Sequence, residues 1–370
     1  MNIQKIVRYM CASVFIVCFL QADTLVNGNI DNFYLNNPVA GADFNSATIF
    51  ASDNGHKLVT SSSGFHAVFT HRLRNYKEYK LYYVTSNAGG SNWSSLQELD
   101  NINIPDTVPG TYALSDPSLA YYNNDIYICY YKSGINETAS GGQDNLRKLR
   151  LIKLPNGRAD QKVSVNIAEA EFGHAFFITD IYVNATGVYV AVTDRDTGMF
   201  TSVRVYKLDS SLNKQAEYHF EYPALGGSPT MNAGAPIFSA GNTSSDFFLA
   251  YAKYDFGLNR INKDNPTGNI VVLRYTSSGW SNVTLNVEDG YIASRPSVLV
   301  SGNQLLVAYS KKAAQNSAHS LGYRAYHDNT FASTAYTEIA TNVTASEILT
   351  TRLGLTTANI PVIQYVFHDG

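Results

Sequence analysis

Short apolar runs separated by small polar turns recur along the chain. In the clearest copy, residues 116–121 are followed by Asn123-Asn124 and then by residues 125–131, which are apolar from Ile126 onward. A similar unit lies at residues 295–309, with Gly302-Asn303 at its turn. Asparagine and glycine readily adopt the positive φ angles of tight hairpin turns. Each unit therefore predicts two antiparallel strands.

The second strand of each unit begins at a regular interval. Its first apolar residues are Phe65, Ile126, Val188, Phe247, Leu305 and Val362, which are 57 to 62 residues apart. These strands are apolar at successive positions and do not alternate, which is typical of strands buried on both faces. A period of about 59 residues over six copies lies in the range of β-propeller blades.

Each unit also contains a third strand, at residues 80–85, 149–154, 203–208, 271–275 and 321–326, and the fourth unit shows a weaker fourth strand at 283–287. The predicted fold is therefore all-β, a six-bladed β-propeller of four-stranded antiparallel blades. The sixth unit stops after its second strand, so we expect strands from residues 24–50 to complete that blade. An open tandem of β-sandwiches is the alternative, although it would not need so regular a period.

The amino terminus predicts export. Lys5 and Arg8 precede an apolar run at residues 10–20, and residues 1–22 together have the pattern of a secretory signal peptide. The run is too short to span a bilayer, so we expect no stable membrane insertion. Residues 23–370 would form a single propeller domain that is secreted to the extracellular space, or to the periplasm in a bacterial source.

Composition excludes several classes of partner and cofactor. Only 15% of residues are charged and the net charge is -3, so no basic surface indicates nucleic acid. No zinc spacing or phosphate-binding loop occurs, and we expect no metal and no cofactor. Cys129 would be alone in the mature chain, which excludes an internal disulfide. Six glycosylation sequons begin at Asn92, Asn136, Asn184, Asn242, Asn282 and Asn342.

A short motif connects the first unit to a known family. Residues 86–93 contain Ser86, Gly90 and Trp93 in the spacing of the Asp-box, with Ala88 in place of the aspartate. The motif resembles that of sialidase-like propellers with BNR repeats. In such a turn the hydroxyl binds backbone, glycine supplies a positive φ and the indole packs on the sheet.

A shortened copy of the motif lies at residues 276–280 in the fourth unit. Its last two residues are Gly279 and Trp280. Both tryptophans of the chain therefore occupy equivalent hairpins. The resemblance implies a structural role for these turns, because in that family the box lies away from the active face.

The residues before each first strand are the candidates for a site, because these positions converge on the centre of a propeller. Sialidase-like enzymes hold a carboxylate with arginines, and the resemblance therefore indicates Arg295 and Arg352, together with Asp116, as catalytic residues. The third arginine and a well-placed nucleophilic tyrosine are absent. A network of ion pairs that only fills the channel is an equally good interpretation of Asp116 and Arg295.

Three further residues are candidates for substrate binding: His56, His174 and Asp180. His174 could also act as the base of a polysaccharide lyase, although a histidine beside Phe176 and Phe177 is more often a packing residue.

The incomplete catalytic set favours a secreted propeller that recognises a glycan through its central face without cleaving it. The first alternative is a glycan-cleaving enzyme, either a sialidase-like glycoside hydrolase or a polysaccharide lyase. The second is an exported scaffold whose partner is another extracellular protein. The residues alone leave open whether the protein is an enzyme.

Overall fold

The structure of the protein is a computed structural model. It describes residues 14–17, 26–29, 56–72, 78–88, 90, 92–103, 113–137, 143–170, 175–195, 201–220, 231–255, 268–285, 292–312, 319–327, 332–333, 336–343, 347–355 and 361–368. Within these residues no helix has the length and apolar character needed to cross a membrane.

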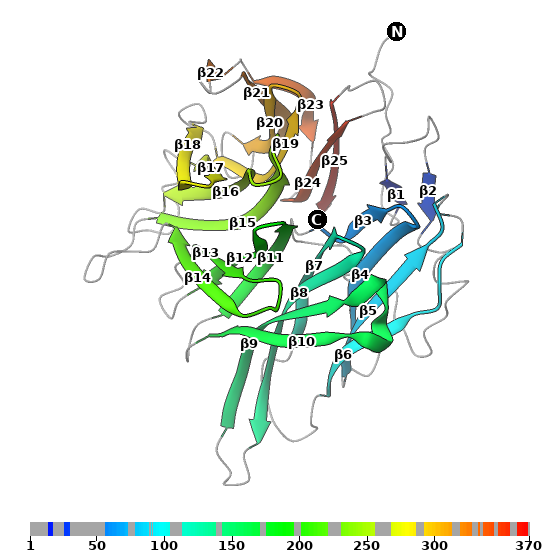
Figure 1. The fold of residues 1–370 in the computed structure, drawn as a ribbon. Coiled ribbons are helices and arrows are strands. Elements are labelled where there is room, and N and C mark those ends of the chain that lie inside the picture. Colours follow the sequence, from blue (N-terminus) through cyan, green and yellow to red (C-terminus); the bar gives the residue numbers. More distant parts are fainter. Residues whose placement is uncertain are drawn as a thin grey trace, which may run out of the picture.

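Antiparallel sheets arranged around a common centre make up the fold (Figure 1). The first sheet contains β3 (Leu58–Ser61), β4 (Gly64–Arg72), β5 (Glu78–Ser86) and β6 (Gln97–Asn103). The second contains β7 (Ala113–Tyr122), β8 (Asp125–Glu137), β9 (Gln143–Leu154) and β10 (Val163–Glu169), with the 3-10 turns η2 (Pro155–Gly157) and η3 (Ala159–Gln161) before β10. The third contains β11 (Ala175–Asn184), β12 (Gly187–Arg195), β13 (Thr201–Leu208) and β14 (Lys214–Phe220).

Two further large sheets follow in the same order. The fourth contains β15 (Met231–Ala240), β16 (Phe247–Asp255), β17 (Gly268–Thr276) and β18 (Gly279–Leu285). The fifth contains β19 (Ile292–Ser301), β20 (Gln304–Lys312) and β21 (His319–His327), and both β22 (Ala332–Ser333) and β23 (Thr337–Val343) pair with β21. The remaining strands form two hairpins, β24 (Glu347–Leu355) with β25 (Pro361–His368), and β1 (Val14–Val17) with β2 (Val26–Asn29).

This architecture confirms an all-β, propeller-like fold of four-stranded antiparallel sheets but corrects the blade count. Five sheets have four or more strands among the described residues, so the prediction of six four-stranded blades is wrong there. Among the described residues, the sixth repeat unit forms the two-stranded hairpin β24–β25. Most of residues 24–50 lie outside the described part of the chain, and completion of that unit by N-terminal strands stays a prediction.

The second strands are buried on both faces because each is shared between two cores. Ile128 and Tyr130 of β8 pack in a cluster with the first sheet, whereas Cys129 and Tyr131 pack in a cluster with the third. Similar clusters join the third sheet to the fourth and the fourth to the fifth. Continuous apolar sequence in these strands is therefore a consequence of sheet-on-sheet packing.

The first strand of each unit lies innermost and contacts the first strand of the next. Three backbone amides join these strands directly. The amide of Leu119 donates to the carbonyl of His56 (2.6 Å). The amide of Phe238 donates to the carboxylate of Asp180 (2.7 Å), and that of Leu353 to the hydroxyl of Ser297 (3.0 Å). Neighbouring units are thus joined at the centre by hydrogen bonds as well as by apolar packing.

A bulge interrupts the innermost strand in four successive sheets. The pairing registers of β7, β11, β15 and β19 each shift by one residue. At these bulges Asp116, Ile178, Ala235 and Arg295 have positive φ angles of 52°, 45°, 55° and 51°. Such a conformation costs about 1–3 kcal/mol in a residue other than glycine. The prediction placed Asp116 and Arg295 just before their strands, whereas the structure places them inside the strands, at the bulges.

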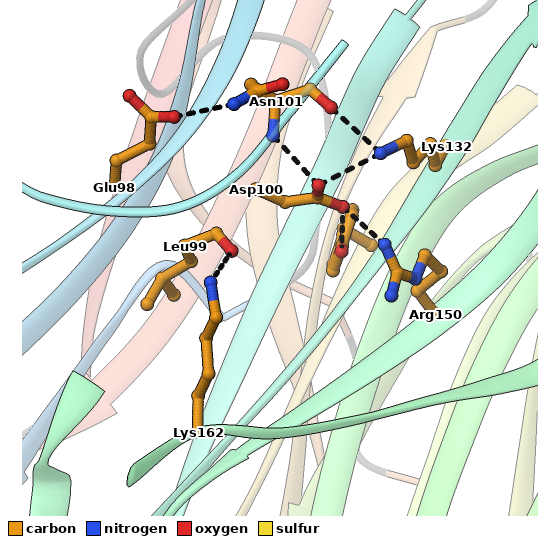
Figure 2. Close-up of polar contacts among 8 residues, drawn as sticks. Glu98, Leu99, Asp100, Asn101, Lys132, Arg150 and Lys162 are labelled. Carbon is orange, nitrogen blue, oxygen red and sulfur yellow. Dashed lines mark hydrogen bonds and ion pairs between the residues drawn. The ribbon is translucent and has the colours of Figure 1, made fainter. Parts of the chain in front are cut away.

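An ionic cluster joins the first sheet to the second farther from the centre (Figure 2). The carboxylate of Asp100 on β6 accepts hydrogen bonds from Tyr130 (2.5 Å), Lys132 (2.9 Å) and Arg150 (2.6 Å). Burial alone would raise the pKa of Asp100, but these hydrogen bonds and the charges of Lys132 and Arg150 outweigh it and hold the pKa below its ordinary value. The carboxylate is therefore ionised at neutral pH and stabilises the contact between the two sheets.

Substitution Asp100→Asn is expected to lower the free energy of unfolding at pH 7 by about 1–2 kcal/mol, because charge-assisted hydrogen bonds are lost at a partly screened site. The lowered pKa belongs to the folded state. The stabilisation by the ionised Asp100 carboxylate is therefore complete above about pH 4 and disappears as the pH falls through the folded-state pKa. The variant should therefore lose less stability on acidification than the parent protein.

Urea denaturation at several pH values between about 2 and 7 measures this difference. Asp160→Asn is the matched control, because Asp160 pairs with Arg158 at the surface and both side chains are more than half exposed. Equal acid dependence in the parent protein and Asp100→Asn would contradict the assignment.

Candidate active site at the centre of the sheets

Asp180 is the most highly connected polar side chain near the innermost strands. It lies on β11 and is 0% exposed. Its Oδ1 accepts hydrogen bonds from the backbone amide of His56 (3.0 Å) and from the hydroxyl of Ser118 (3.0 Å). Its Oδ2 accepts the amide of Phe238 (2.7 Å). One buried carboxylate on the third sheet thus contacts the first, second and fourth sheets, and its hydrogen bonds satisfy the charge that burial would otherwise penalise.

The imidazole of His56 is oriented by the same carboxylate. Its Nδ1 lies 2.8 Å from Oδ1 of Asp180, and about a third of the side chain (36%) is exposed. A proton on Nδ1 makes this contact a hydrogen bond and leaves Nε2 as the nitrogen that can exchange a proton with a ligand. No other hydrogen bond to the ring is found among the residues that the structure describes. A buried carboxylate that holds a partly exposed histidine is an arrangement suited to acid–base chemistry.

Asp116 lies on the neighbouring strand β7, two residues before Ser118. It is half-buried and has the left-handed backbone described above. The hydroxyl of Thr179 donates to its carbonyl oxygen, and Lys57 donates to the carbonyl of Pro117. These contacts from adjacent sheets hold the strained bulge in place. The Asp116 carboxylate makes no hydrogen bond to another described residue.

Asp116, Asp180 and His56 are therefore joined through one set of contacts, although they come from three different sheets. Ser118 and His56 share the same carboxylate oxygen, and Thr179 precedes Asp180 in the chain. Among the predicted candidates these three form a cluster, which supports them as one candidate site.

The other predicted residues lie on other strands or outside the described part of the chain. Arg295 is half-buried at the equivalent bulge of the fifth sheet, so it shares the repeat position of Asp116. Arg352 lies on β24, and its side chain is outside the described part. His174 lies outside the described residues altogether. An opposed Asp116–Arg295 pair across the centre stays a prediction.

The turn that the sequence predicted to be an Asp-box forms a local structure in the first sheet. Ser86 and Trp93 form an antiparallel bridge, and the Ser86 hydroxyl donates to the carbonyl of Asn87 (2.9 Å). Gly90 has a φ of 67°, which favours glycine. The indole of Trp93 packs on apolar residues of the first sheet.

The equivalent turn of the fourth sheet contains Gly279 and Trp280. Gly279 has a φ of 103°. Trp280 packs edge-on against Phe247 and Tyr275. These geometries support structural roles for both turns.

Neither metal binding nor thiol chemistry is indicated at the centre. No group of three histidine, cysteine or acidic side chains that could hold a metal ion occurs among the described residues. Cys129 is fully buried, burial raises the pKa of its thiol to about 12, and the thiol donates to Thr179 (3.3 Å). The thiol is therefore unreactive at neutral pH.

Sequence reasoning missed the residues that support the site. Ser118, Thr179 and Ile178 were not predicted to act there, although an alignment of the repeat units would have placed Ser118 and Asp180 at equivalent positions. The amide of Phe238 could not have been found, because a backbone donor leaves no signal in the sequence.

Comparison with known proteins supports the fold. No family model and no curated protein matches the chain. A structure of the α-L-arabinofuranosidase Arb93A from Fusarium graminearum with an iminosugar inhibitor has a TM-score of 0.53 at 8% identity, covering 90% of this chain and 91% of that one. The GH93 α-L-arabinofuranosidase of Fusarium graminearum with arabinobiose has a TM-score of 0.50, with the same identity and coverage.

A third solved structure is more distant. The α-L-arabinanase of Penicillium chrysogenum with arabinobiose has a TM-score of 0.48 at 11% identity, covering 86% of this chain and 98% of that one. The two structures with TM-scores of 0.50 or more support a shared β-propeller fold, and at 8% identity they do not assign the chain to a family.

These comparisons correct the functional expectation. A glycan-binding propeller without catalysis was favoured from the sequence, and the finding that glycan-cleaving enzymes share the fold contradicts it. The comparisons also give no support to another extracellular protein as the partner.

Replacing Asp180 is expected to destabilise the protein because its two oxygens accept hydrogen bonds on both sides. In Asp180→Asn one oxygen becomes an NH2 group, which opposes a donor in either orientation. We expect a loss of about 2–4 kcal/mol in the free energy of unfolding, against about 1 kcal/mol for Ser118→Ala, which removes a single donor. Chemical denaturation of the two variants measures the difference, and equal stability of Asp180→Asn and the parent protein would contradict the proposed arrangement.

Proposed function

We propose that the protein is a glycan-cleaving enzyme, a glycoside hydrolase whose active site includes His56, Asp116 and Asp180. The observation that carries the proposal is the contact between His56 and the fully buried Asp180 (2.8 Å), with Asp116 on the adjoining strand. Asp116 and Asp180 lie on innermost strands and His56 lies two residues before one, so a ligand at the centre of a propeller can meet all three.

Hydrolysis of a glycosidic bond adds water across the bond between the anomeric carbon and the leaving oxygen. One group must protonate the leaving oxygen, and a carboxylate commonly activates the water or stabilises the positive charge on the sugar. His56, held through Nδ1 by Asp180, is proposed to carry the proton at Nε2 to the leaving oxygen. The Asp116 carboxylate is proposed to face the anomeric carbon and to accept a proton from water.

The left-handed backbone at Asp116 supports its role. A strained conformation persists only where surrounding contacts enforce it, and such conformations cluster at active sites. Here the contacts of Thr179 and Lys57 with adjacent carbonyl groups enforce it. The backbone that carries the carboxylate is thus fixed before substrate binds, which reduces the reorganisation needed during the reaction.

Arabinofuranosides are the first substrate class to test, because the two solved structures with TM-scores of 0.50 or more are of an α-L-arabinofuranosidase. Sialosides are the second, since the Asp-box resemblance and two arginines at repeat positions, Arg295 and Arg352, favour a sugar with a carboxylate. Either substrate would be extracellular, consistent with the secretory signal proposed at residues 1–22.

The test is hydrolysis of an aryl α-L-arabinofuranoside, of arabinan and of a fluorogenic sialoside by residues 23–370. His56→Ala and Asp116→Asn are each expected to lower kcat at least about 100-fold while the fold is retained, because neither side chain is part of a core. Asp160→Asn, an exposed carboxylate remote in the sequence from these residues, is the control and should keep full activity. Full activity in both site variants, or no hydrolysis of any of the three substrates, would overturn the proposal.

A further inference from the structure

A groove of about 300 Å³ lies between the last strand of the third sheet and the fourth sheet, and none of His56, Asp116 and Asp180 lines it. β14 borders one side and β18 the other; both are the outermost strands of their sheets (Figure 1). The buried residues Tyr251 and Leu273 are part of its lining. Phe220 and Trp280, both half-buried, line it, and the exposed residues Ser281 and Asn282 stand at its edge.

The aromatic lining is rigid. Trp280 meets Phe220 at 5.4 Å and 76°, and it also packs edge-on against Phe247 (5.4 Å) and Tyr275 (5.0 Å). Phe220 stacks on Tyr251 at 6.4 Å. Two partly exposed rings at nearly right angles are therefore fixed before any ligand arrives, which reduces the entropy lost on binding.

The edge of the groove is polar. His219 lies there and its Nε2 is 2.8 Å from a Glu217 oxygen, so the ring is held in place. Ser281 and Asn282 add a hydroxyl and an amide. A sugar ring presents C–H groups as well as hydroxyl groups. The rigid aromatic faces of the groove suit the C–H groups, and the surrounding hydroxyl, amide and imidazole groups suit the hydroxyl groups.

The position of Asn282 adds an independent observation. Residues two apart on a strand point to the same face, so Asn282 and Trp280 on β18 share one face. Asn282-Val283-Thr284 is also a glycosylation sequon. A sugar attached to Asn282 would begin at the edge of the groove beside the indole.

We propose that this groove is a saccharide-binding site, separate from the central site, in which a sugar ring packs against Trp280 and Phe220. The sugar can come from two sources, a free oligosaccharide or a glycan linked to Asn282 itself. Both sources place the same sugar chemistry in the groove. The experiments that follow distinguish a free oligosaccharide from a glycan linked to Asn282.

Fluorescence of Trp280 reports on the site directly. The chain contains two tryptophans, so Trp93→Phe leaves Trp280 as the only indole. In that background, with His56→Ala added to prevent hydrolysis, the non-glycosylated protein is titrated with an arabinan oligosaccharide and with the disaccharide of N-acetylglucosamine. A saturable change in emission is expected, with about tenfold weaker binding in Phe220→Leu, which keeps an apolar side chain in the cluster.

Secretion from a eukaryotic host tests the second source. Mass spectrometry would find a glycan on Asn282, and its enzymatic removal would change the Trp280 emission, with Asn282→Gln as the control that carries no glycan. Either response supports the proposal. No change in Trp280 emission with the free sugars or on deglycosylation, or binding that Phe220→Leu leaves unaltered, would overturn it. Hydrolysis at the centre is measured separately, so failure of one proposal does not decide the other.

Discussion

The burial of one carboxylate at the junction of four sheets constrains the centre of this fold. Asp180 has no solvent contact, and each of its oxygens must therefore be satisfied by protein donors. The donors come from the first, second and fourth sheets, so those sheets can approach only in the arrangement that brings His56, Ser118 and the amide of Phe238 to the same point. The same contacts hold the sheets together and orient the imidazole of His56.

The strained bulges have a related origin. Thr179, next to Asp180, binds the carbonyl of Asp116, and Thr193 of the same sheet binds the amide of Ala235 (3.1 Å) at the next bulge. Side chains of the third sheet thus hold left-handed residues in both neighbouring sheets. Conformational strain at the centre is balanced by packing between the blades, whose shared cores extend outward from these strands.

The repeat pattern in the sequence was sufficient to predict the second strands, such as Asp125–Glu137 and Gly187–Arg195, because burial on both faces leaves a continuous apolar signal. It was insufficient for the sixth unit, where Val362 matched the period although the described residues form a two-stranded hairpin in place of a four-stranded blade. Asp180 and His56 were selected as candidates from their repeat positions. Their mutual contact could not be predicted, because it depends on the register between sheets distant in sequence.

A crystal structure of residues 23–370 with a bound iminosugar inhibitor is the measurement that tests the central claim most directly. The account predicts that Asp180 remains buried with His56 Nδ1 at hydrogen-bond distance, and that the inhibitor contacts His56 Nε2 and the Asp116 carboxylate. An inhibitor bound elsewhere, or a His56 ring turned away from Asp180, would contradict the account.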